Sequence, residues 1–325
     1  MLQSNYFLVE DNKTSSYVGR TSAGDFFIHN SEFNSLNNRA ICISSNSYQT
    51  RLLCQQCTFT RCSYSSLQGG SIYFGLKGSC ALVKVCATES KNSGSNNGGV
   101  FSYQVVSQDP STINLIDLST IFNCGVTNEG NNMIEFINGN VTLSNTNESR
   151  NLTPVDPFYE VINATTTEIK YCEFENASYA VYHTIAYVSS PGILNSCNIV
   201  NCKLSNSEGI FYVGKTSISL MNCAILQHQS SAYFYICDTS SVSLINCSID
   251  CGSAGFNTLN IASNKYNTNQ IGNYSFKNQL SLLDYQVCLD DDFYKIQTKI
   301  CITQMAFNYY FMNLLHIFLY IVILA

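Results

Sequence analysis

Short stretches of alternating apolar and polar residues recur along the chain and predict β-strands. In the segment Ile218-Ser-Leu220 every second residue is apolar, and Val242-Ser-Leu244 repeats this pattern further along the chain. Successive side chains of a strand point to opposite faces, so a period of two places the apolar residues on one face. Helical periodicity is nearly absent before residue 305. The pattern therefore predicts an all-β fold built from repeats.

The alternation shifts by one residue at the same point in each repeat. In the first of the two copies the apolar pattern runs to Leu220 and resumes at Cys223. Such a shift moves side chains to the other face of a strand unless the chain bends there. Asn222 and Asn246 occupy the shift, and Asn enters the left-handed backbone region at little cost. We predict a structural corner at both asparagines, with the flanking strands facing one interior.

Cysteines mark the residue after this corner in a longer series of repeats. The series recurs at nearly equal steps and comprises Cys172, Cys197, Cys223 and Cys247. Stacked coils would place these residues in one inward column, where free thiols pack as small apolar side chains. Disulfides between neighbouring coils are the alternative, because adjacent strands bring Cα atoms within bonding range. Cys202 and Cys251 follow members of the series closely and would instead close local loops.

A third strand completes each repeat. The segment 209–213 matches the segment 232–236, and earlier copies begin with the glycine pairs 69–70 and 98–99. Glycine suits a tight turn ahead of a strand. Three short strands in about 24–29 residues predict a parallel β-helix, a solenoid whose stacked coils share one core. A β-sandwich would not show this repeat, and a leucine-rich repeat would need a helical half.

The repeats divide the chain into successive parts. Residues 1–40 are expected to form an irregular cap and the first coils, residues 41–255 the β-helix, and residues 256–304 a C-terminal cap and juxtamembrane linker. At ~25 residues per coil, roughly 285 residues correspond to about eleven coils. Between strands, stretches such as 145–157 are expected to protrude as loops.

The end of the chain differs from the repeats. Residues 305–325 contain no charged residue. As a helix at ~1.5 Å per residue they would span ~31 Å, the thickness of a bilayer core. We predict a transmembrane helix that ties the chain to a membrane. A cleaved hydrophobic tail signal and a buried capping helix are the alternatives.

Composition favours an exported protein. The chain has 16 Cys, and it contains eight Asn-X-Ser/Thr sequons; both features are typical of extracellular proteins. The candidate glycosylation sites are Asn12, Asn140, Asn147, Asn151, Asn163, Asn176 and Asn273. The eighth sequon, Asn246, belongs to the predicted corner and is expected to stay unmodified if it is buried. Residues 1–10 lack the basic start and apolar core of a signal peptide, so either a truncated start or a missing first exon is expected.

Charge argues against nucleic acid as a partner. The net charge is −6, and the few Arg lie far apart, whereas phosphate binding needs clustered Lys and Arg. The membrane, through residues 305–325, is the partner that the sequence predicts most directly. A carbohydrate or protein ligand on the outer face of the solenoid is the other expected partner.

Residues with catalytic or metal-binding chemistry form no pattern in the repeats. Cys54, Cys57 and Cys62 have the spacing of metal ligands, but Cys57 aligns with the inward cysteines and no second knuckle follows. The acidic run 290–292 is expected in a solvated linker, and His183 on the surface or as a satisfied core residue. Isolated aspartates within the repeats are Asp117, Asp156, Asp238 and Asp250. We therefore predict no catalytic residue, no metal site and no cofactor.

Short motifs resemble those of a known family. Gly69-Gly-Ser-Ile72 and Gly98-Gly-Val-Phe101 resemble the Gly-Gly-Ala-[Ile/Leu/Val] motif of chlamydial polymorphic membrane proteins. The segments Phe-Thr-Arg-Cys (59–62), Ile-Phe-Asn-Cys (121–124) and Ile-Val-Asn-Cys (199–202) are similar to the partner motif Phe-X-X-Asn, with Cys in place of Asn. The resemblance covers residues 40–255. It implies a right-handed parallel β-helix, display at the cell surface and adhesion.

Two wider likenesses point the same way. The abundance of Cys together with a C-terminal membrane segment looks like the large surface-protein sets of parasitic protists such as trichomonads. Asn222 and Asn246 resemble the asparagine ladder at a tight corner of the pectate-lyase-like group, which shares the parallel β-helix. That group includes carbohydrate-active enzymes, but a fold alone does not establish an activity.

The sequence favours a non-catalytic binding, adhesion or structural role at the cell surface. Stacked coils present a long flat face. Outward tyrosines such as Tyr212, Tyr233 and Tyr235 would contact a carbohydrate or protein ligand on that face. A polysaccharide lyase or hydrolase is one alternative, but it would need grouped carboxylates that the aspartates do not supply. A nonfunctional fragment of a variable surface family is the other.

Overall fold

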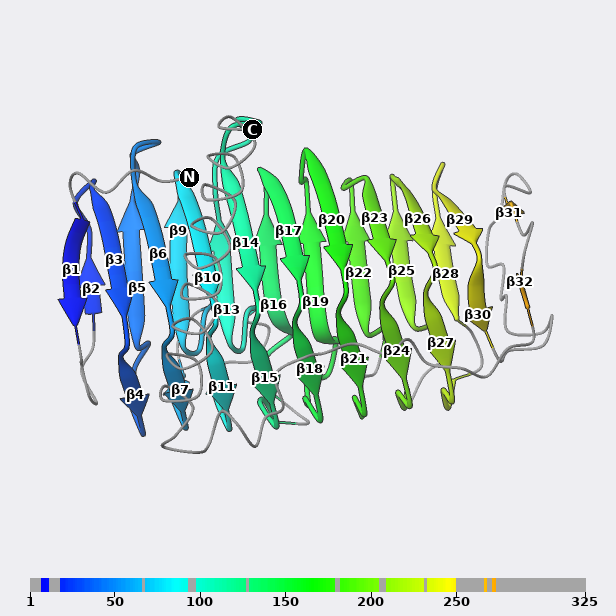
Figure 1. The fold of residues 1–325 in the computed structure, drawn as a ribbon, viewed down its shortest axis with the longest axis horizontal. Helices are drawn as coiled ribbons and strands as arrows, with labels where there is room; N and C mark the ends of the chain where they lie inside the picture. Colours follow the sequence, from blue (N-terminus) through cyan, green and yellow to red (C-terminus); the bar gives the residue numbers. More distant parts are fainter. Residues whose placement is uncertain are drawn as a thin grey trace, which may run out of the picture. The chain divides into compact units, whose positions relative to one another are not determined.

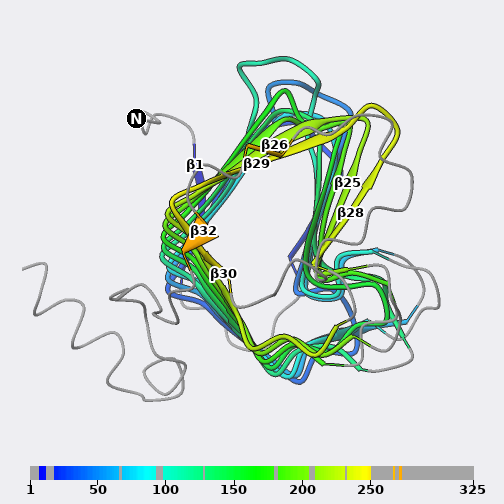
Figure 2. The ribbon, with the colours of Figure 1, turned by 90° about the vertical axis from the view of Figure 1, so that its right-hand side faces the viewer.

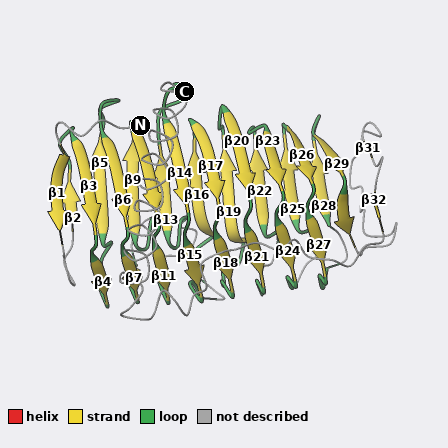
Figure 3. Cartoon of the chain, in the orientation of Figure 1, coloured by secondary structure: helices red, strands yellow, loops and turns green. Residues whose placement is uncertain are grey.

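The alternating segments form strands of three parallel sheets in the computed structural model (Figure 1). The structure describes residues 7–11, 18–65, 68–92, 98–126, 129–178, 182–204, 209–230, 233–249, 266–267 and 271–272. All of these belong to the first of two compact units, Met1–Leu283. These ranges consist of strands and loops (Figure 3). Within them, no helix has the length and hydropathy needed to cross a bilayer; the predicted helix at 305–325 lies outside the described residues.

Each sheet collects one strand from every coil. Sheet A has eleven strands, in spatial order β1 (Phe7–Asp11), β3 (Asp25–His29), β6 (Arg51–Gln55), β10 (Ser79–Val83), β14 (Ile113–Asp117), β17 (Asn140–Ser144), β20 (Thr166–Lys170), β23 (Gly192–Asn195), β26 (Ser217–Met221), β29 (Ser241–Ile245) and β31 (Tyr266–Asn267). Sheet B has ten shorter strands, β4 (Glu32–Asn34), β7 (Thr58–Thr60), β11 (Cys86–Thr88), β15 (Thr120–Phe122), β18 (Asn147–Ser149), β21 (Glu173–Glu175), β24 (Asn198–Val200), β27 (Ala224–Leu226), β30 (Cys247–Ile249) and β32 (Ile271–Gly272).

The third sheet closes the coil. Sheet C has nine strands, β2 (Val18–Arg20), β5 (Ile41–Ser45), β9 (Ile72–Leu76), β13 (Ser102–Val105), β16 (Asn132–Ile137), β19 (Asp156–Ile162), β22 (Ile185–Val188), β25 (Phe211–Gly214) and β28 (Phe234–Cys237). A separate pair joins β8 (Ser63–Tyr64) to β12 (Lys91–Asn92). Viewed along the stack, the three sheets enclose a three-sided section (Figure 2).

The prediction of an all-β parallel solenoid is confirmed. Within the described ranges, eight coils, from β3–β4–β5 to β26–β27–β28, contribute a strand to all three sheets, and β1, β2 and β29–β32 belong to partial coils at the ends. Neighbouring strands pair in parallel and in register, as Ser217 does with Ser241 and Cys80 with Asn114. The coil that separates the second pair is longer than the sequence predicted for any repeat. Strands β3 and β4 of the first complete coil lie within residues 1–40, and its third strand, β5, begins at Ile41.

A residue in the left-handed backbone region turns the chain from sheet A to sheet B in each of the nine coils whose first corner the structure describes. At this first corner φ lies between 47° and 55° in Asn30, Gln56, Lys84, Leu118, Asn145, Tyr171, Ser196, Asn222 and Asn246. The corner N–H still donates to the next coil, as Asn222 N does to Ile245 O at 2.9 Å. A second corner follows sheet B, where φ is 52° to 61° in Ser35, Arg61, Glu89, Asn123, Arg150, Asn176, Asn201 and Gln227. Both corners therefore bend the chain without interrupting the hydrogen bonds between coils.

The interior is built from columns of like residues. The second-last residue of the sheet A strands from β3 to β29 is apolar, for example Leu143, Ile169 and Leu194, which pair in register and are fully buried. Aromatic rings also stack between neighbouring coils, with centroids 5.1 Å apart for Phe33 and Phe59. Parallel neighbours lie ~4.8 Å apart, so these columns leave no gap between coils.

One column contains an acid. The inward residue of the sheet B strands from β4 to β30 is apolar except in β18, where Glu148 lies between Ile121 and Phe174. Glu148 is 0% exposed, and neither carboxyl oxygen has a hydrogen-bond partner. Burial raises the pKa of Glu148 well above its ordinary 4.5, because the charged form has no solvation there. The folded state therefore keeps this carboxyl protonated.

The first corner predicts a stabilising substitution. Leu118 is an exposed apolar residue with φ of 51°, a conformation in which Asn is less strained than Leu. Leu118→Asn is expected to raise the free energy of unfolding by about 1 kcal/mol, measured by urea denaturation. Ile113→Asn is the control, because Ile113 is similarly exposed but lies in strand β14. Equal effects of the two substitutions would contradict strain at the corner.

The burial of Glu148 predicts a loss of folding stability that depends on pH. Its folded-state pKa is raised, so the folded chain holds a proton that the unfolded chain releases, and stability falls as pH rises above about 4.5. Glu148→Leu is expected to stabilise the protein by about 1–3 kcal/mol at neutral pH, and by less at pH 4. Glu168→Leu, at an exposed position of β20, is the matched control. Thermal unfolding at both pH values measures the effect, and a pH-independent gain would argue against it.

Candidate functional site

The outer face of sheet C carries a line of tyrosines and carboxylates. The outward residues of seven consecutive strands pair in register and form what we name the outer strip: Tyr73, Tyr103, Glu135, Glu160, Ala186, Tyr212 and Tyr235. Outward side chains at one position of stacked strands form a row. The strip therefore follows from the same register that builds the core.

Stacked aromatic rings form the two ends of the outer strip. The Tyr73 and Tyr103 ring centroids lie 5.5 Å apart with an interplanar angle of 7°, and those of Tyr212 and Tyr235 lie 5.6 Å apart at 15°. All four rings are half-buried. The Arg39 guanidinium lies 4.2 Å from the Tyr73 centroid. The rings thus present partly exposed apolar surface beside polar groups.

Two glutamates occupy the middle of the outer strip. Glu135 and Glu160 are register partners on β16 and β19. The Asn132 Nδ2 donates to Oε2 of Glu135 at 3.4 Å and to Oε2 of Glu160 at 2.5 Å. Burial, reinforced by the negative charge of Asp156, raises the pKa of Glu135 to about 7 and that of Glu160 to about 8. The pair is therefore partly protonated at neutral pH.

A buried aspartate and a histidine complete this group. Asp156 is 0% exposed, and its Oδ1 lies 2.5 Å from Nδ1 of His183. Burial raises the pKa of Asp156, an effect that His183 opposes. The His183 ring lies 4.9 Å from the Tyr212 ring, which links the group to one tyrosine pair. We name Asn132, Glu135, Asp156, Glu160 and His183 the carboxylate cluster.

A bulge and a glycine shape the carboxylate cluster. The register of β16 and β19 shifts between the Asn132–Asp156 and Ile134–Tyr159 pairs, which gives β19 one extra residue. Such a bulge re-aims side chains, and here it places Asp156 beside the glutamates. Gly98 covers Glu135 from the preceding coil, since a Cβ there would come within 1.4 Å of the Glu135 Oε2. Any larger residue would displace the carboxyl group.

Sequence reasoning overlooked most of this cluster. Of the four isolated aspartates in the repeats, Asp156 is the one that belongs to the carboxylate cluster. Asp117 accepts hydrogen bonds from Ser144 and Asn145, Asp238 is exposed, and Asp250 lies outside the described residues. A signal was present, because Glu135 and Glu160 stand one coil length apart and each is followed by two apolar residues. His183 is partnered by Asp156 and is not a simple surface residue.

One of the predicted outward tyrosines is misplaced. Tyr212 and Tyr235 belong to the outer strip, but Tyr233 is 6% exposed and packs in the core. Its ring meets the His228 ring edge-on at 5.3 Å. Tyr233 precedes β28, so it does not share the alternation of the strand. The expectation that Tyr233 faces a ligand is therefore wrong.

The predicted corner asparagines lie at the first corner. Asn222 and Asn246 both have φ of 53°. The Asn246 Nδ2 donates to Oδ1 of Asn222 at 2.7 Å, and the Asn222 Nδ2 donates to Oδ1 of Asn195 at 3.3 Å. Both corner side chains are exposed, so this ladder runs along the outside of the bend. Asn246 is thus a sequon on the surface.

The predicted cysteine column lies directly inside the first corner. Cys172, Cys197, Cys223 and Cys247 are free thiols with at most 2% exposure. Each thiol donates to backbone carbonyls, as the Cys223 Sγ does to Met221 O at 3.3 Å. Burial is the main cause that raises the pKa of Cys197 and Cys223. Among the other coils, Cys57 is a fifth cysteine at this position, and the rest place Ser31, Val85, Ser119 and Thr146 there.

Three further cysteines lie inside the second corner, in coils that are not direct neighbours. Cys62, Cys124 and Cys202 are buried free thiols there, and burial raises their pKa values to about 11, 12 and 12. The expectation that Cys202 closes a local loop is therefore wrong. Cys54 points inward from β6 and contacts Cys57, whereas Cys62 lies at the other corner. Within the described ranges, no three His, Cys, Asp or Glu side chains are placed to hold a metal ion.

The sequon at Asn151 is inaccessible. Asn151 is 0% exposed, its Oδ1 accepts from Cys124 N–H at 3.1 Å, and its Nδ2 donates to Ile121 O at 3.3 Å. Asn147 belongs to strand β18. The expected protruding loop at 145–157 is therefore wrong at these residues, and a glycan on Asn151 would disrupt the coil.

The other sequons differ in exposure. Asn163 is exposed, whereas Asn140 and Asn176 are half-buried. The Asn176 Oδ1 accepts from Asn201 Nδ2 at 2.6 Å in a second-corner ladder. Asn12 and Asn273 lie outside the described residues. Glycosylation remains a prediction for the exposed positions.

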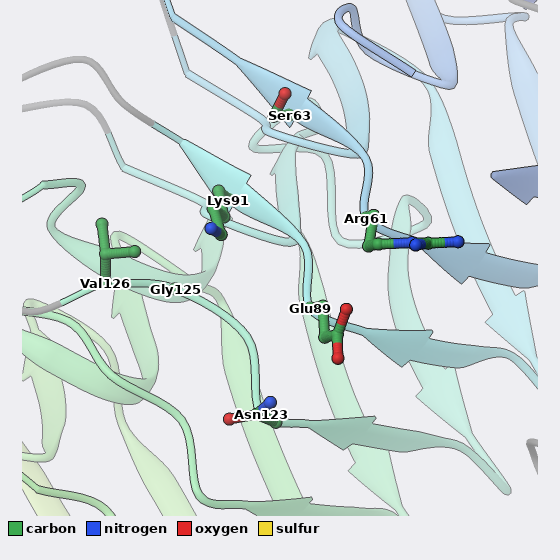
Figure 4. Close-up of a pocket in the computed structure, with 7 residues that line it drawn as sticks. All are labelled: Arg61, Ser63, Glu89, Lys91, Asn123, Gly125 and Val126. Atoms are coloured by element: carbon green, nitrogen blue, oxygen red, sulfur yellow. The ribbon is translucent and has the colours of Figure 1, made fainter. Parts of the chain in front are cut away.

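A shallow groove lies on the outside of the second corner (Figure 4). It has a volume of about 420 Å³ and is lined by Arg61, Ser63, Glu89, Lys91, Asn123, Gly125 and Val126. Arg61, Glu89 and Asn123 are second-corner residues of three consecutive coils. Charges of both signs line it, so it has less defined chemistry than the carboxylate cluster.

The glutamate pair predicts how stability depends on pH. Both folded-state pKa values exceed the ordinary 4.5, so the free energy of unfolding falls as pH rises from about 4.5 to about 7 for Glu135 and about 8 for Glu160. The slope is up to about 1.4 kcal/mol per pH unit for each carboxyl. Urea denaturation between pH 5 and pH 8 is expected to show a shallower dependence in Glu135→Gln/Glu160→Gln. An unchanged slope would contradict the raised pKa values.

Comparison with known proteins leaves the site to be interpreted from its own geometry. The features that carry chemistry are the outer strip, the carboxylate cluster and the groove. The chain matches no family model, no curated protein and no solved structure.

Proposed function

We propose that this protein is a cell-surface solenoid that binds an extended carbohydrate along the outer strip without transforming it. The observation that carries the proposal is the arrangement of two stacked tyrosine pairs on either side of Glu135 and Glu160. Seven strands at a spacing of ~4.8 Å give a strip of about 29 Å. A chain of several sugar units fits that length.

The chemistry of the outer strip suits a carbohydrate. Tyrosine rings offer flat apolar surface that packs against the C–H faces of sugars, and the phenol oxygens donate and accept hydrogen bonds. The carboxyl groups of Glu135 and Glu160 accept hydrogen bonds from hydroxyl groups. Rigid strands hold these groups in a fixed row, which limits the conformational entropy lost on binding.

Surface display is part of the proposal. The apolar segment 305–325, the 16 Cys and the eight sequons support export and membrane attachment. The likeness of the glycine-pair repeats to polymorphic membrane proteins supports adhesion, and with it a right-handed winding of the solenoid. Adhesion through a long repetitive face needs no catalysis.

A carbohydrate-active enzyme is the second candidate, and one observation favours it. Glu135 and Glu160 lie on neighbouring strands, and the Asn132 amide contacts both carboxyl groups. Neighbouring strands ~4.8 Å apart suit the ~5–5.5 Å carboxylate separation of retaining glycosidases better than the ~6.5–9.5 Å of inverting ones. A carboxyl with a pKa of about 7 or 8 also suits a general acid.

Binding is tested with tyrosine variants. The full chain is presented to immobilised neutral, amino and acidic oligosaccharides. Tyr212→Ala/Tyr235→Ala is expected to weaken binding about tenfold, because it removes one aromatic platform. Tyr48→Ala is the control, since Tyr48 is 60% exposed and lies outside the outer strip. Undiminished binding by the double variant would contradict the role of the strip.

Catalysis is distinguished by the products. A non-catalytic protein releases no reducing ends from polysaccharides that it binds. If reducing ends appear, and Glu135→Gln or Glu160→Gln abolishes them while binding persists, the enzyme replaces the binding protein as the better assignment. The proposal is supported if the wild-type protein and both variants bind polysaccharide and none of them releases reducing ends.

A further inference from the structure

The carboxylate cluster has more acidic than basic groups. Glu135, Asp156 and Glu160 supply three carboxyl groups, and His183 is the basic group that interacts with Asp156. Outside the cluster, Glu135 interacts electrostatically with Tyr103 on β13, and a tyrosine carries no positive charge. When these carboxyl groups ionise, the middle of the outer strip favours a positively charged ligand group over a neutral or negative one.

Two buried acceptors in the carboxylate cluster lack donors. Asn132 is 2% exposed, and its Nδ2 donates to both glutamates while its Oδ1 has no hydrogen-bond partner. Asp156 is 0% exposed, and its Oδ1 pairs with His183 while its Oδ2 has no partner. Buried polar atoms are almost always paired in folded proteins. Both unpaired atoms belong to side chains that contact Glu135, Glu160 or His183 through their other polar atom.

The cluster is reachable from outside the solenoid. Glu160 and His183 retain partial exposure, whereas Asp156 and Asn132 lie deeper. Tyr103 lies one coil before Glu135, and Tyr212 lies against His183. Aromatic faces attract cations, so both flanks suit the same kind of ligand group as the carboxyls do.

From this geometry we propose that the carboxylate cluster binds the protonated amine of an amino sugar within the glycan held by the outer strip. The inference rests on the proposed glycan binding and deepens it. An ammonium group brings one positive charge and three donors. A sugar hydroxyl brings one donor and no charge, and an acetylated amine brings one donor. The free amine therefore supplies donors to the unpaired acceptors, and its positive charge stabilises the ionised form of the carboxyls whose pKa burial raises.

The test uses two oligosaccharides that differ in acetylation alone. Glucosamine hexamer and N-acetylglucosamine hexamer are titrated into the full chain at pH 6.5 and followed calorimetrically. The free-amine hexamer is expected to bind about tenfold tighter or more, because hydrogen bonds between charged groups are the stronger kind. The preference is expected to weaken as salt is raised.

Variants locate the preference at the cluster. Glu135→Gln/Glu160→Gln has the shape of the protonated pair but cannot ionise beside the amine, so it is expected to fold and to bind both hexamers equally. Gly98→Ala keeps every carboxyl but crowds Glu135, and it is expected to reduce the preference. Glu168→Gln, exposed on sheet A, is the matched control and should retain it. Tyr235→Ala is expected to weaken the binding of both hexamers to the same degree.

The outcomes separate this inference from the proposed function. Equal affinity of wild-type protein for both hexamers overturns amine recognition and leaves glycan binding intact. A preference that survives Glu135→Gln/Glu160→Gln overturns the assignment to this cluster. The amino-sugar ligand is overturned if neither hexamer binds, or if a lysine octapeptide binds in their place. If neither hexamer binds, the oligosaccharide assay with the tyrosine variants shows whether the protein binds any glycan.

Discussion

The structure depends on one backbone constraint, the left-handed residue that each coil adopts at its corners. Without it, the strands before and after the bend would turn their apolar groups to opposite sides. With φ near 50° the chain bends, and the N–H of the corner residue still reaches the next coil, as Leu118 N reaches Ser144 O. Leu118 and Tyr171 also adopt this conformation, although their residue types disfavour it. Hydrogen bonds and packing between neighbouring coils hold the bend in place and offset its strain.

Stacking in register turns sequence into columns, and the columns carry different chemistry on the two faces. Inside, apolar side chains and buried thiols fill the section, and Glu148 survives there as a protonated acid. Outside sheet C, the same register aligns tyrosines and brings Glu135 beside Glu160. Burial of the pair, reinforced by the negative charge of Asp156, raises both pKa values. A surface row of groups with altered proton affinity thus follows from the solenoid itself.

The carboxylate cluster is the place where the regular pattern is broken. A bulge in β19 adds a residue and moves Asp156 next to the glutamates, and Gly98 supplies the space above Glu135. Bulges near functional sites re-aim side chains at a local cost. Unpaired acceptors on Asn132 and Asp156 are a further cost in the protein alone. Both costs make sense if a ligand supplies the missing donors.

The sequence alone determined the solenoid, because period-two alternation, a parity shift and a nearly constant repeat length have one common solution, stacked strands around a bend. Asn222, Asn246 and four cysteines stood out since they repeat by residue type. The remaining corner residues, such as Gln56 and Tyr171, did not, because tertiary stacking imposes a φ that their types do not prefer. Only the tertiary structure showed that Asn151 and Tyr233 are buried. It alone assembled the carboxylate cluster, because its members share no motif and meet through the register of neighbouring coils and one bulge.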